Sequence, residues 1–189
     1  MKTTIETIRI KHMIDPDPDL SFLGEYTDDL QPGVIVRDLG EFYEKLPAVM
    51  ERDTDGRFMG KGAPEVPSKG REYRGFIPYA GGEKPGTRAF YRYGMKDFER
   101  IQQLEREYFS FIGIRAEAVV QYPIAGNPGS FRLETLTSGG LWGIESDSGD
   151  YLKEVAKEQL EDLKQHLEQF GVDTSDFDEK AENAETVNA

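Results

Sequence analysis

Four carboxylates lie close together in the sequence, between the only tryptophan of the chain and its last amphipathic segment. They are Glu145, Asp147, Asp150 and Glu154. Hard cations such as Mg²⁺ bind carboxylate oxygens and let water fill the remaining positions, so the first three are weak candidates for metal ligands. A metal-dependent enzyme of the nuclease or phosphoryl-transfer kind is one function that such a group would support.

The same acids also have a structural explanation. Asp and Ser side chains before a helix accept hydrogen bonds from its first N–H groups, and acids in the first turn gain about 0.3 to 1 kcal/mol from the helix dipole. We therefore expect Asp147, Ser148 or Asp150 to cap a helix that begins at Tyr151, and we predict no cofactor. The candidate binding residues of this block are Trp142, Glu145, Asp147 and Asp150.

A second group of residues interleaves arginines with aromatic side chains between positions 71 and 93. Aromatic faces stack on unpaired bases and guanidinium groups neutralise phosphates, as single-stranded nucleic acid requires. The alternative is that the rings pack into a core while the arginines stack over them or pair with surplus carboxylates. The candidate binding residues here are Arg71, Tyr73, Arg74 and Arg92, in a region that ends at Tyr93.

The charge of the chain weighs against nucleic acid as the favoured partner. The formal net charge is -13, and residues 144–189 contain 14 acidic and 4 basic side chains. Residues 51–93 are more basic, with 9 basic and 6 acidic side chains. Binding to phosphate backbones is driven mainly by counterion release from clustered Lys and Arg, which an acidic chain disfavours.

Composition excludes several other classes of function. The chain has no Cys, which excludes a disulfide framework, a thiolate nucleophile and a cysteine zinc site. His12 and His166 are the only histidines, and no serine lies in a nucleophile-elbow context. No stretch approaches the roughly 18 apolar residues of a membrane span, so we expect a soluble cytoplasmic protein with no membrane partner.

Hydrophobic periodicity predicts the elements that must position these side chains. Residues 3–13 are rich in β-branched side chains and predict a strand. Residues 111–136 predict a β-hairpin, because two alternating segments flank the turn sequence GNPGS. Residues 38–50 predict a short helix, and residues 95–108 and 151–170 predict two amphipathic helices.

These elements predict an α+β fold, with a small antiparallel sheet and two amphipathic helices packed on one of its faces. The middle segment 51–86 is rich in Gly and Pro and is expected to be a long irregular loop or insertion. Residues 1–172 then form a single α+β domain. The acidic tail 173–189 has little core material and is expected to be disordered.

The block around the tryptophan is expected to join the hairpin to the last helix. Ser138, Gly139 and Gly140 would turn the chain out of the hairpin. Trp142, with its neighbours Leu141 and Ile144, is then expected where the sheet and the last helix meet.

Several irregular blocks carry a family resemblance. The most specific is SGGLWGIESDS at 138–148, and the others are DPDLSFLGEYTD, GREYRGF, FIGIRAEAVV and EQLEDLK. With these blocks the chain resembles an uncharacterised protein family found in bacteriophages and other mobile elements, from residue 15 to about residue 172. The family has no established activity, so the resemblance implies a biological setting and assigns no residue a role.

A mobile-element setting favours small accessory proteins that bind host or phage machinery. Our leading hypothesis is an acidic, non-enzymatic accessory protein in the host cytoplasm that acts by protein-protein interaction, in host takeover or anti-defence. Two alternatives stay open. One is a metal-dependent enzyme that uses the Glu145 to Glu154 carboxylates, and the other is a single-stranded nucleic-acid binder that uses the Tyr73 to Tyr93 region.

Overall fold

The computed structural model describes residues 2–45, 51–52, 58–59, 73–127 and 129–188. The chain divides into two compact units. We call Met1–Pro18 with Phe109–Ala189 the terminal unit, and Asp19–Tyr108 the central unit. The sequence predicts one domain over 1–172, and the structure differs because the middle of the chain supplies a second hydrophobic core of its own.

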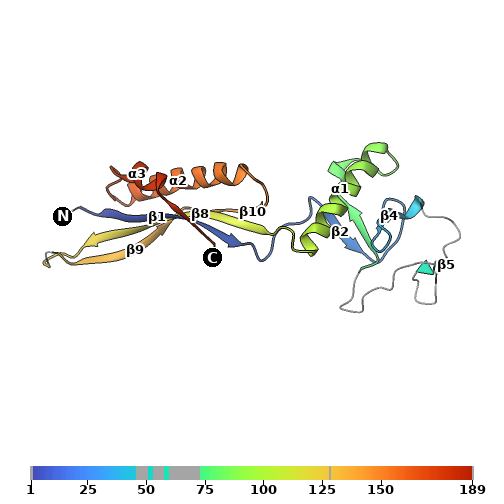
Figure 1. Ribbon diagram of the computed structural model, residues 1–189, viewed down its shortest axis with the longest axis horizontal. Helices are drawn as coiled ribbons and strands as arrows, with labels where there is room; N and C mark the ends of the chain where they lie inside the picture. The colour runs from blue at the N-terminus through green and yellow to red at the C-terminus, as the bar shows by residue number, and fades with distance from the viewer. Residues whose placement is uncertain (1, 46–50, 53–57, 60–72, 128, 189) are drawn as a thin grey trace. The chain divides into compact units, whose positions relative to one another are not determined.

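The terminal unit is a five-stranded sheet with helices on one face (Figure 1). Its strands are β1 (Thr4–Ile14), β8 (Phe111–Pro123), β9 (Phe131–Thr137), β10 (Leu141–Glu145) and β11 (Glu185–Asn188). Antiparallel pairs join β1, β9 and β10 to β8, whereas β11 runs parallel to β1. The strand predicted at 3–13 and the hairpin predicted at 111–136 are confirmed.

Alternation along the strands explains why one face of this sheet is covered. Every second side chain of β8, from Ile112 to Val120, is buried together with apolar residues of β1. The helix α2 (Tyr151–Gln169) packs on this face with its stripe of Val155, Leu163 and Leu167. The helix predicted at 151–170 is therefore confirmed, and it has the amphipathic pattern expected of a helix on a sheet.

The acidic tail is ordered, in contrast to the predicted disorder. Residues Phe177–Glu182 form helix α3, and β11 then adds to the sheet beside β1. Phe177 is buried in the core, and Lys164 of α2 forms an ion pair of 2.8 Å with Asp178. The burial of Phe177 and the backbone pairing of β11 stabilise the tail, and the polar composition of this segment indicates neither contribution.

A buried polar group fixes the end of β9 to α2. The Gln159 Oε1 atom accepts hydrogen bonds from the Ser138 hydroxyl at 2.8 Å and from the Gly140 N–H at 2.9 Å. The Ser138 Oγ atom in turn accepts a hydrogen bond of 3.0 Å from the Ala116 N–H. Residues 138–140 turn the chain between β9 and β10, as predicted, and one glutamine holds this turn in place.

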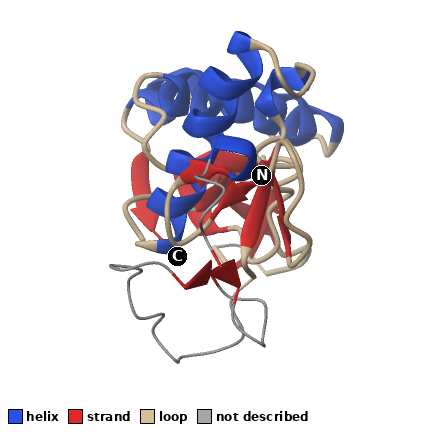
Figure 2. Cartoon of the chain, turned by 90° about the vertical axis from the view of Figure 1, so that its right-hand side faces the viewer, coloured by secondary structure: helices blue, strands red, loops and turns tan. Residues whose placement is uncertain are grey.

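The central unit is a second small sheet covered by one long helix (Figures 1 and 2). The order of strands across the sheet is β2 (Gly24–Thr27), β7 (Gly75–Pro78), β3 (Ile35–Val36) and β4 (Glu41–Phe42). The remaining elements are α1 (Arg88–Glu105), the 3-10 turns η1 (Tyr43–Lys45) and η2 (Ala80–Gly82), and the pair β5 (Glu51–Arg52) and β6 (Phe58–Met59).

Aromatic side chains form the core of this unit. Phe42, Phe76, Phe90 and Phe98 are all buried, and neighbouring rings lie 5.6 to 5.8 Å apart between centroids. The helix begins where the Thr87 hydroxyl accepts a hydrogen bond from the Phe90 N–H. Aromatic packing of this kind buries enough apolar area to support a separate core.

Three details of the predicted architecture differ from the structure. The helix predicted at 95–108 begins earlier, at Arg88, and it packs on β7 of the central unit instead of on the hairpin sheet. In place of a helix at 38–50, Phe42 lies in a strand and enters the aromatic core, and residues 46–50 lie outside the described part. The segment 51–86 contributes β7, whose partners β2 and β3 are distant in sequence, so local periodicity does not reveal it.

None of the helices in the described ranges combines the length and apolarity needed to cross a bilayer.

Substitution Gln159→Leu is expected to lower the free energy of unfolding by about 1 to 3 kcal/mol, because it leaves the Ser138 hydroxyl and the Gly140 N–H without their acceptor. Chemical denaturation followed by circular dichroism measures the change. The matched control is Glu158→Leu at the preceding exposed position, which is expected to change stability by less than about 0.5 kcal/mol. Equal effects of the two substitutions would contradict the role assigned to Gln159.

Candidate functional site

One face of the terminal sheet carries none of the described helices of that unit (Figure 1). We call it the open face. Residues directly opposite each other on antiparallel strands point to the same side, so the register assigns the odd-numbered positions of β8 and their partners to this face. It includes Lys11, Met13, Gly113, Arg115, Glu117, Val119, Leu133, Thr135 and Trp142.

Trp142 lies flat against the backbone of β8 at Gly113. A Cβ atom placed on Gly113 would lie only 2.4 Å from the Trp142 Cε3 atom and 2.5 Å from its Cδ2 atom. The Trp142 Nε1 atom lies beside Gly140, because a Cβ atom placed on Gly140 would be 3.4 Å from it. Trp142 is still 46% exposed, so a side chain that packs closely on the strand also presents a large aromatic surface to solvent.

This position corrects the prediction that Trp142 lies between the sheet and the last helix. Ile144 does enter the core, and Leu141 is 37% exposed at the edge of the sheet. The register shifts between Leu141 and Ile144, and Gly143 has a φ of 74° there. This bulge adds one residue, so that Leu141 and Ile144 both point to the helix side while Trp142 between them points to the opposite face. The Asp15 Oδ2 atom accepts a hydrogen bond of 3.1 Å from the Gly143 N–H.

A group of three charged side chains lies beside the tryptophan on the open face. Glu117 accepts hydrogen bonds from Arg115 at 2.6 and 3.0 Å, and its other carboxylate oxygen lies 2.9 Å from the Lys11 Nζ atom. Glu117 is only 8% exposed although none of the described helices of the terminal unit packs on this face. Burial alone would raise the pKa of Glu117, but the hydrogen bonds and positive charges of Lys11 and Arg115 outweigh it and lower the pKa.

The predicted carboxylates do not gather into a metal site. Within the described ranges, no group of three or more His, Asp or Glu side chains is arranged to hold a metal ion. Glu145 lies in β10 opposite Phe111, whereas Asp150 forms an ion pair of 2.7 Å with Lys153. Asp150 occupies the N-cap position of α2, but its side chain makes no capping hydrogen bond. Asp147 follows β10, before the helix begins.

The structure also separates the predicted arginines and tyrosines. Tyr73 stacks on Tyr26 with centroids 5.9 Å apart and planes 4° from parallel, and it is 47% exposed. Arg37 lies over the Tyr26 ring at 5.0 Å. Arg92 instead donates a hydrogen bond of 2.8 Å to the neighbouring Tyr93 hydroxyl. The carbonyl of Arg74 accepts a hydrogen bond from the Arg37 N–H. Arg71 lies outside the described residues.

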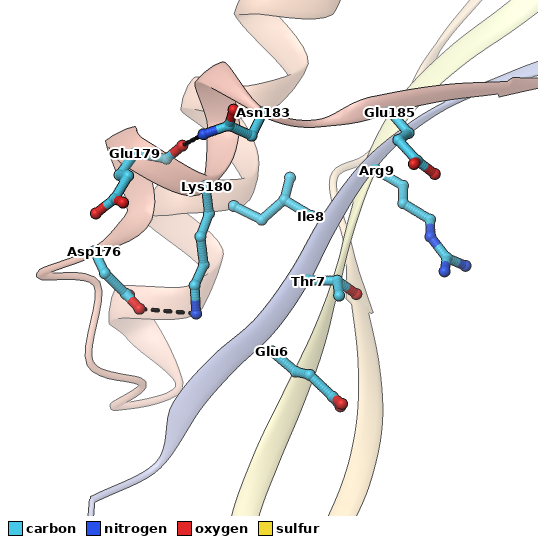
Figure 3. Close-up of a pocket in the computed structure, with 9 residues that line it drawn as sticks. All are labelled: Glu6, Thr7, Ile8, Arg9, Asp176, Glu179, Lys180, Asn183 and Glu185. Carbon is cyan, nitrogen blue, oxygen red and sulfur yellow. Dashed lines mark hydrogen bonds and ion pairs between the residues drawn. The ribbon is translucent and has the colours of Figure 1, made fainter.

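A hollow of about 420 Å³ lies between β1 and α3 (Figure 3). Its lining residues are Glu6, Thr7, Ile8, Arg9, Asp176, Glu179, Lys180, Asn183 and Glu185. Lys180 pairs with Asp176 at 2.8 Å and also donates to the Ile5 carbonyl, so this cation is used to attach α3 to β1. None of the predicted site residues lies here.

Sequence reasoning missed several residues of the open face. In the sequence, Lys11, Arg115 and Glu117 are recognised only as polar residues that alternate with apolar ones along the predicted strands. One signal was available: a glycine inside a strand pattern marks a close approach, and Gly113 is such a residue. The side chain that approaches it comes from β10, about 30 residues later, which only the sheet pairing reveals.

Comparison of the chain with protein-family models, with curated proteins and with solved structures found no match. The resemblance to a phage and mobile-element family therefore stays a prediction.

Substitution Gly113→Ala is expected to displace Trp142, because the new methyl group would overlap the indole ring. The change should cost about 1 to 3 kcal/mol of stability and make the only tryptophan of the chain more accessible to acrylamide quenching. Gly139→Ala is the matched control, since a Cβ atom there meets no neighbour within 4 Å. Unchanged quenching in Gly113→Ala would contradict the stacked arrangement.

The lowered pKa of Glu117 predicts a specific loss of stability in acid. Below the ordinary value of 4.5 the unfolded chain takes up a proton at this side chain before the folded chain does. The stabilisation from ionised Glu117 is therefore complete above that pH and is lost as the pH falls through the folded-state pKa. Urea unfolding at several pH values should show that the free energies of unfolding of the wild type and of Glu117→Gln become equal in acid. The control is Glu161→Gln at an exposed position. Its free energy of unfolding should differ from that of the wild type by the same amount at every pH.

Proposed function

We propose that the chain is a protein-binding module whose open face contacts the partner, with Trp142 at the centre of the contact. The proposal extends to the setting that the sequence suggests: an accessory protein of a phage or mobile element that acts on host machinery. One observation carries it, namely an indole that is rigidly stacked on a strand and yet 46% exposed.

Rigid exposed aromatic residues are typical of binding interfaces. The residues that dominate binding energy in protein interfaces are enriched in Trp, Tyr and Arg and cluster near the centre of the contact. Trp142 loses little conformational entropy on binding, because Gly113 and Gly140 already confine its ring. Val119 and Thr135 extend the same face along β8 and β9.

The charged group beside Trp142 supports the same proposal. Glu117 is already desolvated and paired, so covering it with a partner costs little further desolvation. Lys11 and Arg115 are held in fixed positions by this carboxylate, and both keep donors that are not used in the pairs with Glu117. A face with a rigid indole and two fixed cations can recognise carbonyl or carboxylate groups of a partner.

The two alternative functions have less support. The metal-dependent enzyme has no carboxylate group of the required arrangement within the described ranges. The exposed stack of Tyr73 on Tyr26 supports the nucleic-acid hypothesis, but Arg92 is hydrogen-bonded to Tyr93. The net charge of -13 also opposes binding to phosphate backbones.

Photo-crosslinking in cells tests the proposal. A benzophenone amino acid replaces Met13, which lies opposite Gly113 and beside Trp142, and the full chain is expressed in bacterial cells. We expect a discrete crosslinked adduct to a cellular protein, and we expect Trp142→Ala in the same background to reduce its yield about tenfold or more, as for a residue that contributes at least 1.4 kcal/mol.

Two matched controls accompany this experiment. The same amino acid at Phe170, exposed at the end of α2, should give no such adduct. Gly139→Ala should leave the Met13 adduct unchanged. The proposal fails if the adduct is absent, or if it forms equally from position 170 or in the Trp142→Ala background.

A further inference from the structure

The outer edge of β9 has no partner strand among the described residues. β9 pairs with β8 on one side, and no described strand pairs with its other side. Phe131 and Leu133 on this strand are 45% and 57% exposed. Edge strands of soluble proteins are usually short, bulged or covered, because an open row of backbone groups invites a further strand. An open edge with exposed apolar side chains therefore points to strand pairing with another chain.

We propose that β9 pairs with β9 of a second copy of this chain, antiparallel, about a two-fold axis that passes beside Leu133. The proposal goes beyond the function proposed above and depends on neither Trp142 nor its partner. Two five-stranded sheets would then continue into one across the β9 edges. Two-fold dimers with self-complementary contacts are the commonest oligomers of soluble proteins.

Charge complementarity favours a second copy of β9 as the pairing strand, and it favours this register. With Leu133 opposite its own copy, Arg132 of each chain lies opposite Glu134 of the other. Phe131 then lies opposite Thr135, and the two Leu133 side chains meet on the axis. In the single chain Arg132 and Glu134 already lie 2.9 Å apart, with side chains 65% and 41% exposed, so the dimer needs only to exchange or share these ion pairs. Opposite charges and apolar pairs across strands are each stabilising.

Neighbouring registers are disfavoured by the same rule. Moving the axis by one residue toward the N-terminus places Arg132 opposite Arg132, and moving it one residue the other way places Glu134 opposite Glu134. Like charges directly opposite on paired strands are destabilising. The sequence of β9 is thus self-complementary around one residue, Leu133.

The two-fold axis also keeps the open faces of the two copies on the same side of the joined sheet. An axis perpendicular to the sheet turns each strand antiparallel to its copy and keeps each face on the same side. Residues opposite each other must then point to the same face, and Phe131, Leu133 and Thr135 all belong to the open face. The net charge of -13 per chain opposes association, but at about 0.15 M salt it is screened beyond roughly 8 Å, while the contact pairs are closer than that.

Sedimentation velocity of the full chain tests the dimer. The wild type should sediment as a dimer at about 0.1 mM, and Arg132→Glu and Glu134→Arg should each dissociate about tenfold more readily, because each places like charges opposite each other twice. An equimolar mixture of the two variants should recover the dimer, since every pair is again of opposite charge. Far-ultraviolet circular dichroism confirms that both variants are folded.

Cysteine crosslinking tests the register. The chain has no Cys, so each introduced cysteine is the only thiol. With oxidised glutathione, Leu133→Cys should form a disulfide-linked dimer rapidly. Phe131→Cys and Thr135→Cys alone should crosslink at least about tenfold more slowly, because each lies opposite the other residue; mixed together, the two should crosslink with each other.

A wild type that is monomeric at about 0.1 mM would overturn the proposal. So would a mixture of the two charge variants that stays dissociated, or equal crosslinking rates at positions 131, 133 and 135. None of these results bears on the proposed protein partner, whose adduct from position 13 has a mass different from twice that of the chain.

Discussion

The antiparallel pairing of β1 with β8 is the interaction on which the terminal unit depends. It joins the first strand of the chain to a strand more than 90 residues later, over ten paired positions from Thr4 to Ile14. Because side chains of a strand alternate, this one pairing decides which half of β8 enters the core and which half faces outward. The packing of α2, the addition of β11 and the composition of the open face all follow from it.

Polar contacts then decide the path of β10 against β8. Gln159 holds the turn before this strand, and Asp15 binds the backbone of the bulge within it. Leu141 and Ile144 both pair with core positions of β8. Trp142, which follows Leu141, points to the open face by ordinary alternation, whereas the bulge after it returns Ile144 to the helix side. The position of the indole thus depends on hydrogen bonds from other segments, which are buried or partly buried at Gln159 and exposed at Asp15. This separation of a packed face from a rigid outward face is what the proposed binding function uses.

The central unit depends on a different constraint. Its strands are only two to four residues long, so backbone pairing alone supplies little stability. Interlocking phenylalanines from β4, β7 and α1 form its core. The aromatic residues between 71 and 93 that could have stacked on nucleic acid are in part this core, as the alternative interpretation of that segment stated. Tyr73, Tyr79 and Tyr93 remain exposed, and Tyr73 is stacked on Tyr26.

The sequence by itself determined the long elements of the terminal unit and its α+β class, because a strand of alternating side chains and a helix with one apolar stripe are local patterns. It did not determine the second core, the ordered tail or the position of Trp142. Short strands such as β7 and β11 carry no periodic signal, and their stability comes from partners distant in the chain. The sequence prediction included Trp142 among its candidate binding residues, whereas the carboxylates predicted with it do not gather into a metal site within the described residues. Only the tertiary structure placed Trp142 on Gly113, because the pairing of Leu141 with Ile114 and the bulge before Ile144 decide to which face each side chain of β10 points.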